Sequence, residues 1–133
     1  MNKEYLKAMT IAENALIQLK GLYDKASTEE FDNRKACKSL EKFIEDIEDF
    51  VRDIKHYSKD TELGYLQLNS NGRYVLNDTE LTCGYPIEIY NTKYNEWNDG
   101  RIEHSSEYDG YYFYNYDKDH IVLNDCVKAR IRV

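Results

Sequence analysis

The sequence predicts an α+β fold in which an antiparallel helical hairpin precedes a small antiparallel β-barrel. Up to about residue 58 the apolar residues recur at spacings of three and four, which is the period of a helix. From Gly64 onward they alternate with polar residues, and turn pairs such as Asn71-Gly72 and Asp109-Gly110 separate the short runs. We therefore expect a hairpin over residues 1–58, a link over 59–63 and a barrel domain over 64–133.

The first predicted helix covers about residues 2–25. Its apolar stripe consists of Tyr5, Met9, Ala12, Leu16, Leu19 and Tyr23, at alternating spacings of four and three. Four further apolar residues widen the stripe, namely Ile11, Ala15, Ile17 and Leu22. A stripe of this width predicts contact with more than one neighbour.

The second predicted helix begins at Ser27-Thr28-Glu29-Glu30, which has the form of a capping box. Its apolar stripe ends near Ser58 and consists of Ala36, Leu40, Phe43, Ile47, Phe50, Ile54 and Tyr57. The break at Ala26-Ser27 favours a hairpin in which the two stripes bury each other, and a parallel coiled-coil dimer is the alternative.

Short strands separated by tight turns predict a closed or half-open barrel of the SH3-like or OB-like type. The expected strands are 65–69, 73–76, 87–90, 101–104, 110–116, 121–123 and 129–133, with turns that include 69–72, 98–100 and 108–110. In the central strand 110–116, Tyr111 and Phe113 share one face, while Tyr112, Tyr114 and Tyr116 share the other. The second face would be a tyrosine ladder, either covered by the N-terminal half or offered to a partner.

The charge of the chain narrows the classes of partner, and its cysteine content indicates the compartment. The chain carries 18 Lys and Arg against 25 Asp and Glu, and both halves are acidic. This balance disfavours general affinity for nucleic acid or anionic membranes and favours a basic partner, or a site that normally holds nucleic acid. Three cysteines outside any C-x-x-C pair, and no apolar run near the roughly 18 residues that cross a bilayer, predict a soluble protein of the reducing cytoplasm.

The β half carries a recognisable order of short motifs. These are Gly72-Arg73-Tyr74, Ile87-Glu88-Ile89, Trp97, Gly110-Tyr111-Tyr112 and Ala129-Arg130-Ile131-Arg132. They resemble a small β-barrel family of unknown function found mostly on phage, plasmid and other mobile elements of Gram-positive bacteria. Small acidic proteins of such elements, with this kind of barrel beside helices, look like anti-CRISPR proteins. The resemblance implies an inhibitor of a type II CRISPR effector nuclease in the host cytoplasm, and it transfers no catalytic residue.

An acidic row marks the second helix. Glu41, Glu45, Asp49 and Asp53 follow one another at i, i+4 spacing, or about 6 Å per step. Such a row could mimic phosphates and occupy an arginine-lined nucleic-acid channel. The alternative is a solvated helix face that is partly neutralised by Lys38, Lys42, Arg52 and Lys55.

Aromatic and basic residues of the β half give two further candidate sets. Partner anchors would be Trp97, Tyr112, Tyr114 and Tyr116, with packing as the competing interpretation. Contacts to RNA or single-stranded DNA would be Arg73, Arg101, Arg130 and Arg132, with cross-strand pairing to Glu88 and Glu103 as the competing interpretation.

Three functions therefore stay open. The first is a non-catalytic inhibitor that binds a CRISPR effector nuclease, or its guide-loaded complex, and blocks guide RNA or target DNA engagement. The others are a small-barrel nucleic-acid-binding accessory protein and a non-catalytic protein-interaction domain. His104, His120, Cys83 and Cys126 show neither a nucleophile motif nor metal-ligand spacing, so no enzyme, metal or cofactor is expected. The chain would act as a monomer or as a homodimer through the helices.

Overall fold

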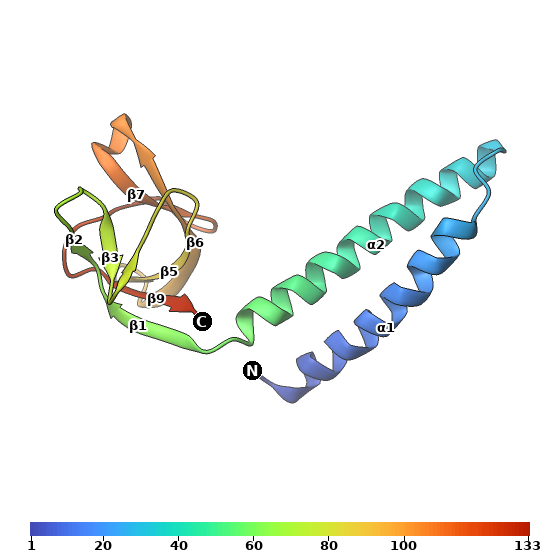
Figure 1. The fold of residues 1–133 in the computed structure, drawn as a ribbon, viewed down its shortest axis with the longest axis horizontal. Coiled ribbons are helices and arrows are strands. Elements are labelled where there is room, and N and C mark those ends of the chain that lie inside the picture. Colours follow the sequence, from blue (N-terminus) through green and yellow to red (C-terminus); the bar gives the residue numbers. More distant parts are fainter. The chain divides into compact units, whose positions relative to one another are not determined.

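The computed structural model describes all 133 residues and divides into two compact units, Met1–Lys59 and Asp60–Val133. The first unit holds two helices, and the second holds nine strands and one short 3-10 helix (Figure 1). The predicted α+β class is therefore confirmed. Neither helix is long and apolar enough to span a membrane.

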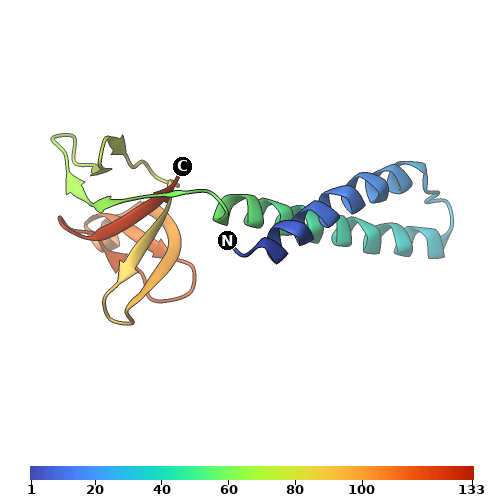
Figure 2. The same ribbon diagram turned by 90° about the horizontal axis from the view of Figure 1, so that it is seen from below.

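The two helices, α1 (Lys3–Lys25) and α2 (Phe31–Tyr57), run antiparallel to one another (Figures 1 and 2). Asn2 caps α1, because its side-chain oxygen accepts from the amide of Glu4 at 2.9 Å. Ile44 and Val51 of α2 are the buried residues of the seam between the helices. Two salt bridges cross this seam, Lys20 to Glu48 at 3.6 Å and Lys55 to Glu13 at 3.4 Å.

The start of α2 differs from the prediction. Ser27 Oγ accepts from the amide of Glu29 at 3.4 Å, and the N-cap is Glu30, whose side chain makes no capping hydrogen bond. Because Glu30 is in the extended conformation, the helix starts at Phe31 and its first bond runs from the Arg34 amide to the Glu30 carbonyl. The predicted capping box is therefore wrong.

The buried stripe of α2 is also rotated from the predicted one. The apolar spacing predicts Phe43 in the seam, but Phe43 is 54% exposed, whereas Ile44, one position further along the helix, is buried. A step of one residue turns a helix by about 100°, so Phe43 belongs to a different side of the hairpin.

Six strands form the larger sheet in the order β1-β9-β5-β6-β7-β8, with every neighbouring pair antiparallel. They are β1 (Thr61–Tyr65), β5 (Pro86–Asn91), β6 (Glu96–Ser105), β7 (Gly110–Asn115), β8 (Ile121–Val122) and β9 (Lys128–Arg132). The smaller sheet pairs β2 (Gln67–Leu68), β3 (Tyr74–Leu76) and β4 (Thr79–Glu80) in that order. The 3-10 helix is η1 (Ser106–Tyr108), between β6 and β7.

Strand β1 starts earlier than expected. Thr61 already pairs with Arg132, so the strand occupies part of the stretch that was assigned to a link. Only Leu66 separates β1 from β2, and this buried residue exchanges two backbone hydrogen bonds with Val127 and Cys126. Strands β1 and β8 each have a single neighbour, so the pairing does not close the sheet. A closed SH3-like or OB-like barrel stays a prediction.

A second difference concerns the turn predicted at residues 98–100. These residues lie inside β6, and the turn before it contains Asn95, which has a φ of 51°. Asn98 and Gly100 imitate a turn signal in the sequence, but both are buried on the inner side of the sheet. A side chain at Gly100 would collide with the Phe113 ring and the Tyr114 carbonyl, so glycine is required by close packing.

The core lies between the two sheets. The larger sheet contributes inward residues such as Ile87, Ile89, Ile102 and Phe113, and Leu66, Leu76 and Leu81 pack against them from the smaller sheet and its connections. Because strand residues alternate, the opposite face of the larger sheet is left without a covering layer of its own unit. We call this opposite face the outer face.

Candidate interaction face

The strand register fixes which side chains share the outer face, because directly opposed residues of antiparallel strands point to the same side. The members include Leu63, Tyr65, Pro86, Glu88, Tyr90, Trp97, Asp99, Arg101, Glu103, Tyr112, Tyr114, Val122, Lys128, Arg130 and Arg132. Tyr116 continues the face just past β7, since its amide bonds to the Asp99 carbonyl at 3.1 Å. Three predicted arginines and all four predicted aromatic anchors therefore share one surface.

Five rings form a continuous aromatic array along β7. Tyr108 stacks on Tyr112 with ring centroids 4.1 Å apart, and His120 lies 4.3 Å from Tyr114 and 5.6 Å from Tyr112. Tyr114 also meets Tyr116 edge-on at 6.1 Å. The predicted tyrosine ladder is thus present, with Phe113 buried on the other side of the strand.

Arg101 joins this array to the neighbouring strand. Its guanidinium lies 4.2 Å from the ring centroid of Tyr114 and 5.6 Å from that of Tyr116. Its Nε donates to Glu103 at 2.7 Å. Hydrogen bonds with Tyr116 and Glu103 raise the pKa of Arg101. The bond to Glu103 orients the guanidinium over the rings.

A second cluster surrounds Trp97 at the other end of β6. Tyr90 meets Trp97 edge-on at 5.4 Å, and the Arg130 guanidinium lies 4.2 Å from a Trp97 ring centroid. Lys128 lies 5.0 Å from the Tyr90 ring. The two clusters together give the outer face two places where a cation lies on an aromatic ring.

Glu88 anchors the basic residues between these clusters. It is 6% exposed and accepts from Arg130 at 2.8 Å and from Arg132 at 2.7 Å. Burial works to raise the pKa of Glu88, but the hydrogen bonds from Arg132 and Arg130 outweigh it and the pKa is lowered. The cross-strand pairing considered for these arginines is therefore present at Glu88.

Charge is distributed unevenly over the β half. Four of its seven cations lie on the outer face, at Arg101, Lys128, Arg130 and Arg132, but only three of its eleven carboxylates do. The outer face consequently has a net charge near +1, although the β half as a whole is acidic. The outer face is therefore less acidic than the rest of the β half.

Arg73 lies apart from the other predicted basic residues. It follows the turn that leads into β3 of the smaller sheet, and its Nη1 donates to Glu80 at 2.7 Å. Hydrogen bonds with Glu80 and with Tyr111 raise its pKa. The four arginines therefore do not form one cluster, and each is paired with a carboxylate.

The carboxylate row of α2 belongs to the helical unit, and Glu41, Glu45, Asp49 and Asp53 are all exposed. Glu41 accepts a hydrogen bond from the Tyr23 hydroxyl, and this bond raises the pKa of Tyr23 to about 12. Of the cations expected to neutralise the row, Arg52 pairs with Asp49 at 2.8 Å, whereas Lys55 pairs with Glu13 of α1. Of the row, only Asp49 therefore forms a salt bridge.

Three buried asparagines fix the turns that border the outer face. Asn98 Oδ1 accepts from Asn91 at 2.8 Å and from Asn115 at 3.1 Å. Asn91 Oδ1 in turn accepts from the amide of Lys93, and Asn115 Oδ1 accepts from the amides of Asp117 and Lys118. One amide network thus ties the β5–β6 turn to the β7–β8 turn.

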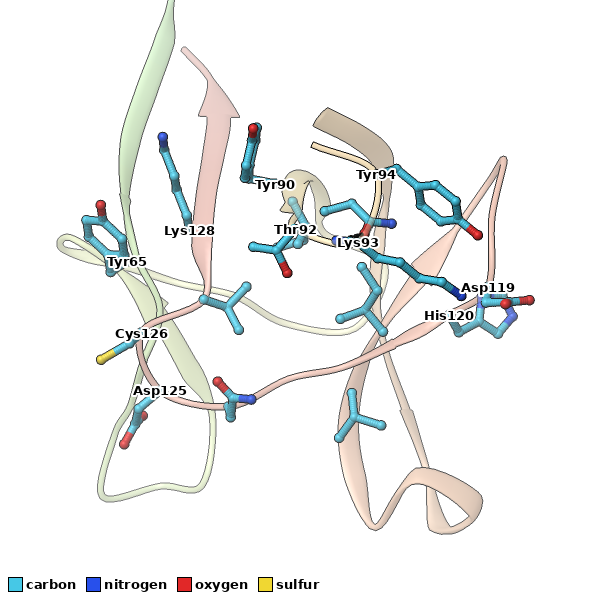
Figure 3. Close-up of a pocket in the computed structure, with 16 residues that line it drawn as sticks. Tyr65, Tyr90, Thr92, Lys93, Tyr94, Asp119, His120, Asp125, Cys126 and Lys128 are labelled. Carbon is cyan, nitrogen blue, oxygen red and sulfur yellow. Dashed lines mark hydrogen bonds between the residues drawn. The ribbon is translucent and has the colours of Figure 1, made fainter. Parts of the chain in front are cut away.

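A cleft of about 740 Å³ opens where β5 and β9 separate, beyond the last pair Ile89 and Ala129. Figure 3 shows Tyr65, Cys126 and Asp125 on one wall and Tyr94, Asp119 and His120 on the other. Its lining also includes the apolar residues Ile89, Ile121 and Val127. No group of three or more His, Cys, Asp or Glu side chains that could hold a metal ion is present in the chain.

Four members of the two clusters, Tyr90, Lys128, Tyr108 and His120, are not among the anchors predicted from the sequence. Tyr90 and Lys128 could have been found by extending the strand alternation, since they share a face with Glu88 and Arg130. Tyr108 and His120 come from the segments that flank β7, and their place depends on tertiary packing rather than on periodicity.

Comparison with known proteins gives one match. Residues 64–131 match the model of a domain of unknown function, DUF5348. No curated protein and no solved structure matches the chain. The matched range runs from within β1 to within β9 and thus contains almost all of the larger sheet and most of its outer face, although Leu63 and Arg132 lie just outside it. The chain therefore belongs to the DUF5348 family of domains of unknown function.

Proposed function

We propose that this protein is a non-catalytic protein-binding module and that the outer face is its docking surface. The observation that carries the proposal is the content of that face, where Trp97, four tyrosines of the larger sheet and three arginines lie together. Tyrosine, tryptophan and arginine are the residue types that supply most of the binding energy at protein interfaces.

Pre-organisation supports the same proposal. Arg101 is held by Glu103 and stacked on Tyr114, and Arg130 is held by Glu88 and stacked on Trp97. Side chains that are already ordered lose little conformational entropy when a partner binds. The face would therefore bind as it stands, with no reorganisation of the sheet.

For the partner, we propose a type II CRISPR effector nuclease or its guide-loaded complex, as the resemblance of the β half implies. The acidic row of α2 would then take positions normally held by phosphates, and binding would block guide RNA or target DNA engagement. The exposure of the row and the absence of a salt bridge at Glu45 and Asp53 are compatible with that role. An anti-CRISPR protein of this kind would act in the cytoplasm of the host bacterium.

The test is co-purification of the protein with a purified type II effector, with and without guide RNA, followed by a DNA-cleavage assay on the same samples. We expect a stable complex and lost cleavage. A variant with Glu41 and Glu45 replaced by Gln, and Asp49 and Asp53 by Asn, should lose inhibition while remaining folded. If this folded variant inhibits as well as the parent chain, phosphate mimicry is rejected.

A second function, binding of RNA or single-stranded DNA, is favoured by one observation. The aromatic array lies beside the cations of the same face, and stacked rings flanked by cations are typical of proteins that bind single strands. However, each arginine of the face already pairs with a carboxylate. Affinity for a mixed-sequence oligonucleotide that falls steeply with salt would favour this function over the first.

A further inference from the structure

The helical hairpin carries a second apolar face, separate from the seam between its helices. Its apolar residues are Ile11, Ala15 and Leu22 of α1 and Ala36, Phe43, Phe50 and Tyr57 of α2, which recur at helical spacing, and the polar Gln18 lies among them. Ile11 is 70% exposed, Leu22 62% and Phe43 54%. A groove of about 520 Å³ runs between the helices on this side and joins Ile11, Ala15 and Leu22 to Phe43.

The hairpin by itself buries few of its apolar side chains. Ile44 and Val51 are its only buried residues, although each helix exceeds twenty residues. A pair of amphipathic helices normally buries its remaining apolar side against another layer, and two hairpins packed together make a four-helix bundle. The second apolar face therefore needs a cover of similar length.

The charges that border the second apolar face indicate what packs against it. Asp32, in the first turn of α2, is an exception, but four exposed charges that border the second apolar face divide by sign along the helix: Lys35 and Lys42 lie in its first half, and Asp46 and Asp53 in its second half. None of these four forms a salt bridge within the chain. In contrast, charges beside the seam are paired, as in Lys20 with Glu48 and Lys55 with Glu13.

A second copy of the chain supplies the complementary pattern when the two α2 helices run antiparallel. With the twofold axis near residue 44, Lys35 opposes Asp53 of the other copy, and Lys42 opposes Asp46. Nearly the same register places Phe43 beside its symmetry mate and the large Phe50 opposite the small Ala36. A parallel pair would instead bring like charges together, which is destabilising.

We propose that two copies associate through this face as an antiparallel four-helix bundle. The proposal does not rest on the proposed function, because it uses helical residues only. The bundle would pair Asp53 with a lysine of the second copy and leave Glu41, Glu45 and Asp49 of the acidic row exposed.

The test is the mass of the full chain in solution, measured by light scattering after gel filtration and by sedimentation over a range of concentrations. We expect twice the chain mass of 15.8 kDa. Ile11→Lys should raise the dissociation constant at least about tenfold, because the change occurs twice in a symmetric interface. Ile17→Lys is a matched control, since Ile17 is equally exposed (72%) but lies on the opposite side of α1.

The register is tested by charge exchange. Lys42→Asp should weaken the dimer, and the double variant Lys42→Asp with Asp46→Lys should restore it, because opposite charges again face each other. Circular dichroism checks that each variant keeps its helices. A monomeric parent chain, or a dimer that Ile11→Lys leaves intact, would overturn the proposal. A dimer that Lys42→Asp weakens and the double variant does not restore would overturn the antiparallel register.

Discussion

The Arg101 guanidinium lies 4.2 Å from the ring centroid of Tyr114, its direct partner across the β6–β7 pair. The same arginine is held by Glu103 on its own strand and lies 5.6 Å from the Tyr116 ring. One residue therefore links the aromatic array of β7 to the charged residues of β6, and the proposed docking surface depends on it.

Replacing Arg101 by alanine should weaken binding of the protein partner by at least about tenfold, or ~1.4 kcal/mol, as expected for an interface anchor. Arg101→Lys should recover only part of this loss, because an ammonium lacks the planar surface that stacks on tyrosine. The measurement is a titration of the effector with each variant. Arg73→Ala is the control, since Arg73 also pairs with a glutamate but lies off the outer face. Equal losses in Arg73→Ala and Arg101→Ala would contradict the assignment.

Glu88→Gln should lower the free energy of unfolding by about 2–4 kcal/mol near neutral pH, because Arg130 and Arg132 would lose their shared carboxylate. Urea denaturation at neutral pH gives this value. Glu103→Gln is a useful comparison, since Glu103 is more exposed than Glu88 and should cost less than about 1 kcal/mol.

The difference in unfolding free energy between the parent chain and Glu88→Gln should depend on pH in a definite direction. The pKa of Glu88 is lowered from 4.5 in the folded state, so its stabilising contribution is complete above that value and disappears as the pH falls through the folded pKa. The difference in unfolding free energy between the parent chain and Glu88→Gln should therefore shrink on acidification from neutral pH to about pH 3. A difference that stays constant over this range would show that the ion pairs do not supply the stability.

Asn98→Ala should destabilise the β unit by about 2–4 kcal/mol, because the side-chain amides of Asn91 and Asn115 would lose their shared acceptor inside the protein. Asn124→Ala, at an exposed asparagine between β8 and β9, should stay within about 0.5 kcal/mol of the parent chain. Thermal and urea unfolding provide the comparison. A cost at Asn98 no larger than that at Asn124 would mean that the amide network is not structural.

The Tyr23 phenol should titrate with a pKa near 12, because deprotonation would place its charge beside Glu41 and break their hydrogen bond. In Glu41→Gln the pKa should fall toward the ordinary value of 10.0. Carbon-13 labelling of the tyrosine rings and an NMR titration at high pH would resolve it. An unchanged pKa in the variant would show that Glu41 does not contact Tyr23 and is available only to solvent or a partner.

Much of the architecture is predictable because it follows from the local spacing of apolar residues. The alternation along Tyr112, Phe113 and Tyr114 is enough to separate the aromatic array from the core, and the helical spacing is enough to predict the hairpin. The choice of Phe43 over Ile44 for the seam was wrong because both lie in a broad apolar arc, and only packing against α1 decides between them.

Other features could not be found in the sequence because they depend on contacts between distant residues. Asn98 and Gly100 have the composition of a turn, yet they lie in a strand because one joins a buried amide network and the other makes room for Phe113. Likewise, no pattern in the sequence gives His120 a role, yet its ring packs against Tyr112 and Tyr114 because the segment between β7 and β8 brings it there.

The most direct measurement of the central claim compares two exposed tyrosines of the same unit. Tyr116 lies on the outer face and is 52% exposed, and Tyr94 lies in the β5–β6 turn and is 45% exposed. We predict that Tyr116→Ala loses co-purification with the effector and restores DNA cleavage, while Tyr94→Ala behaves as the parent chain does. If the parent chain forms the complex and Tyr116→Ala binds and inhibits equally well, the outer face is not the docking surface.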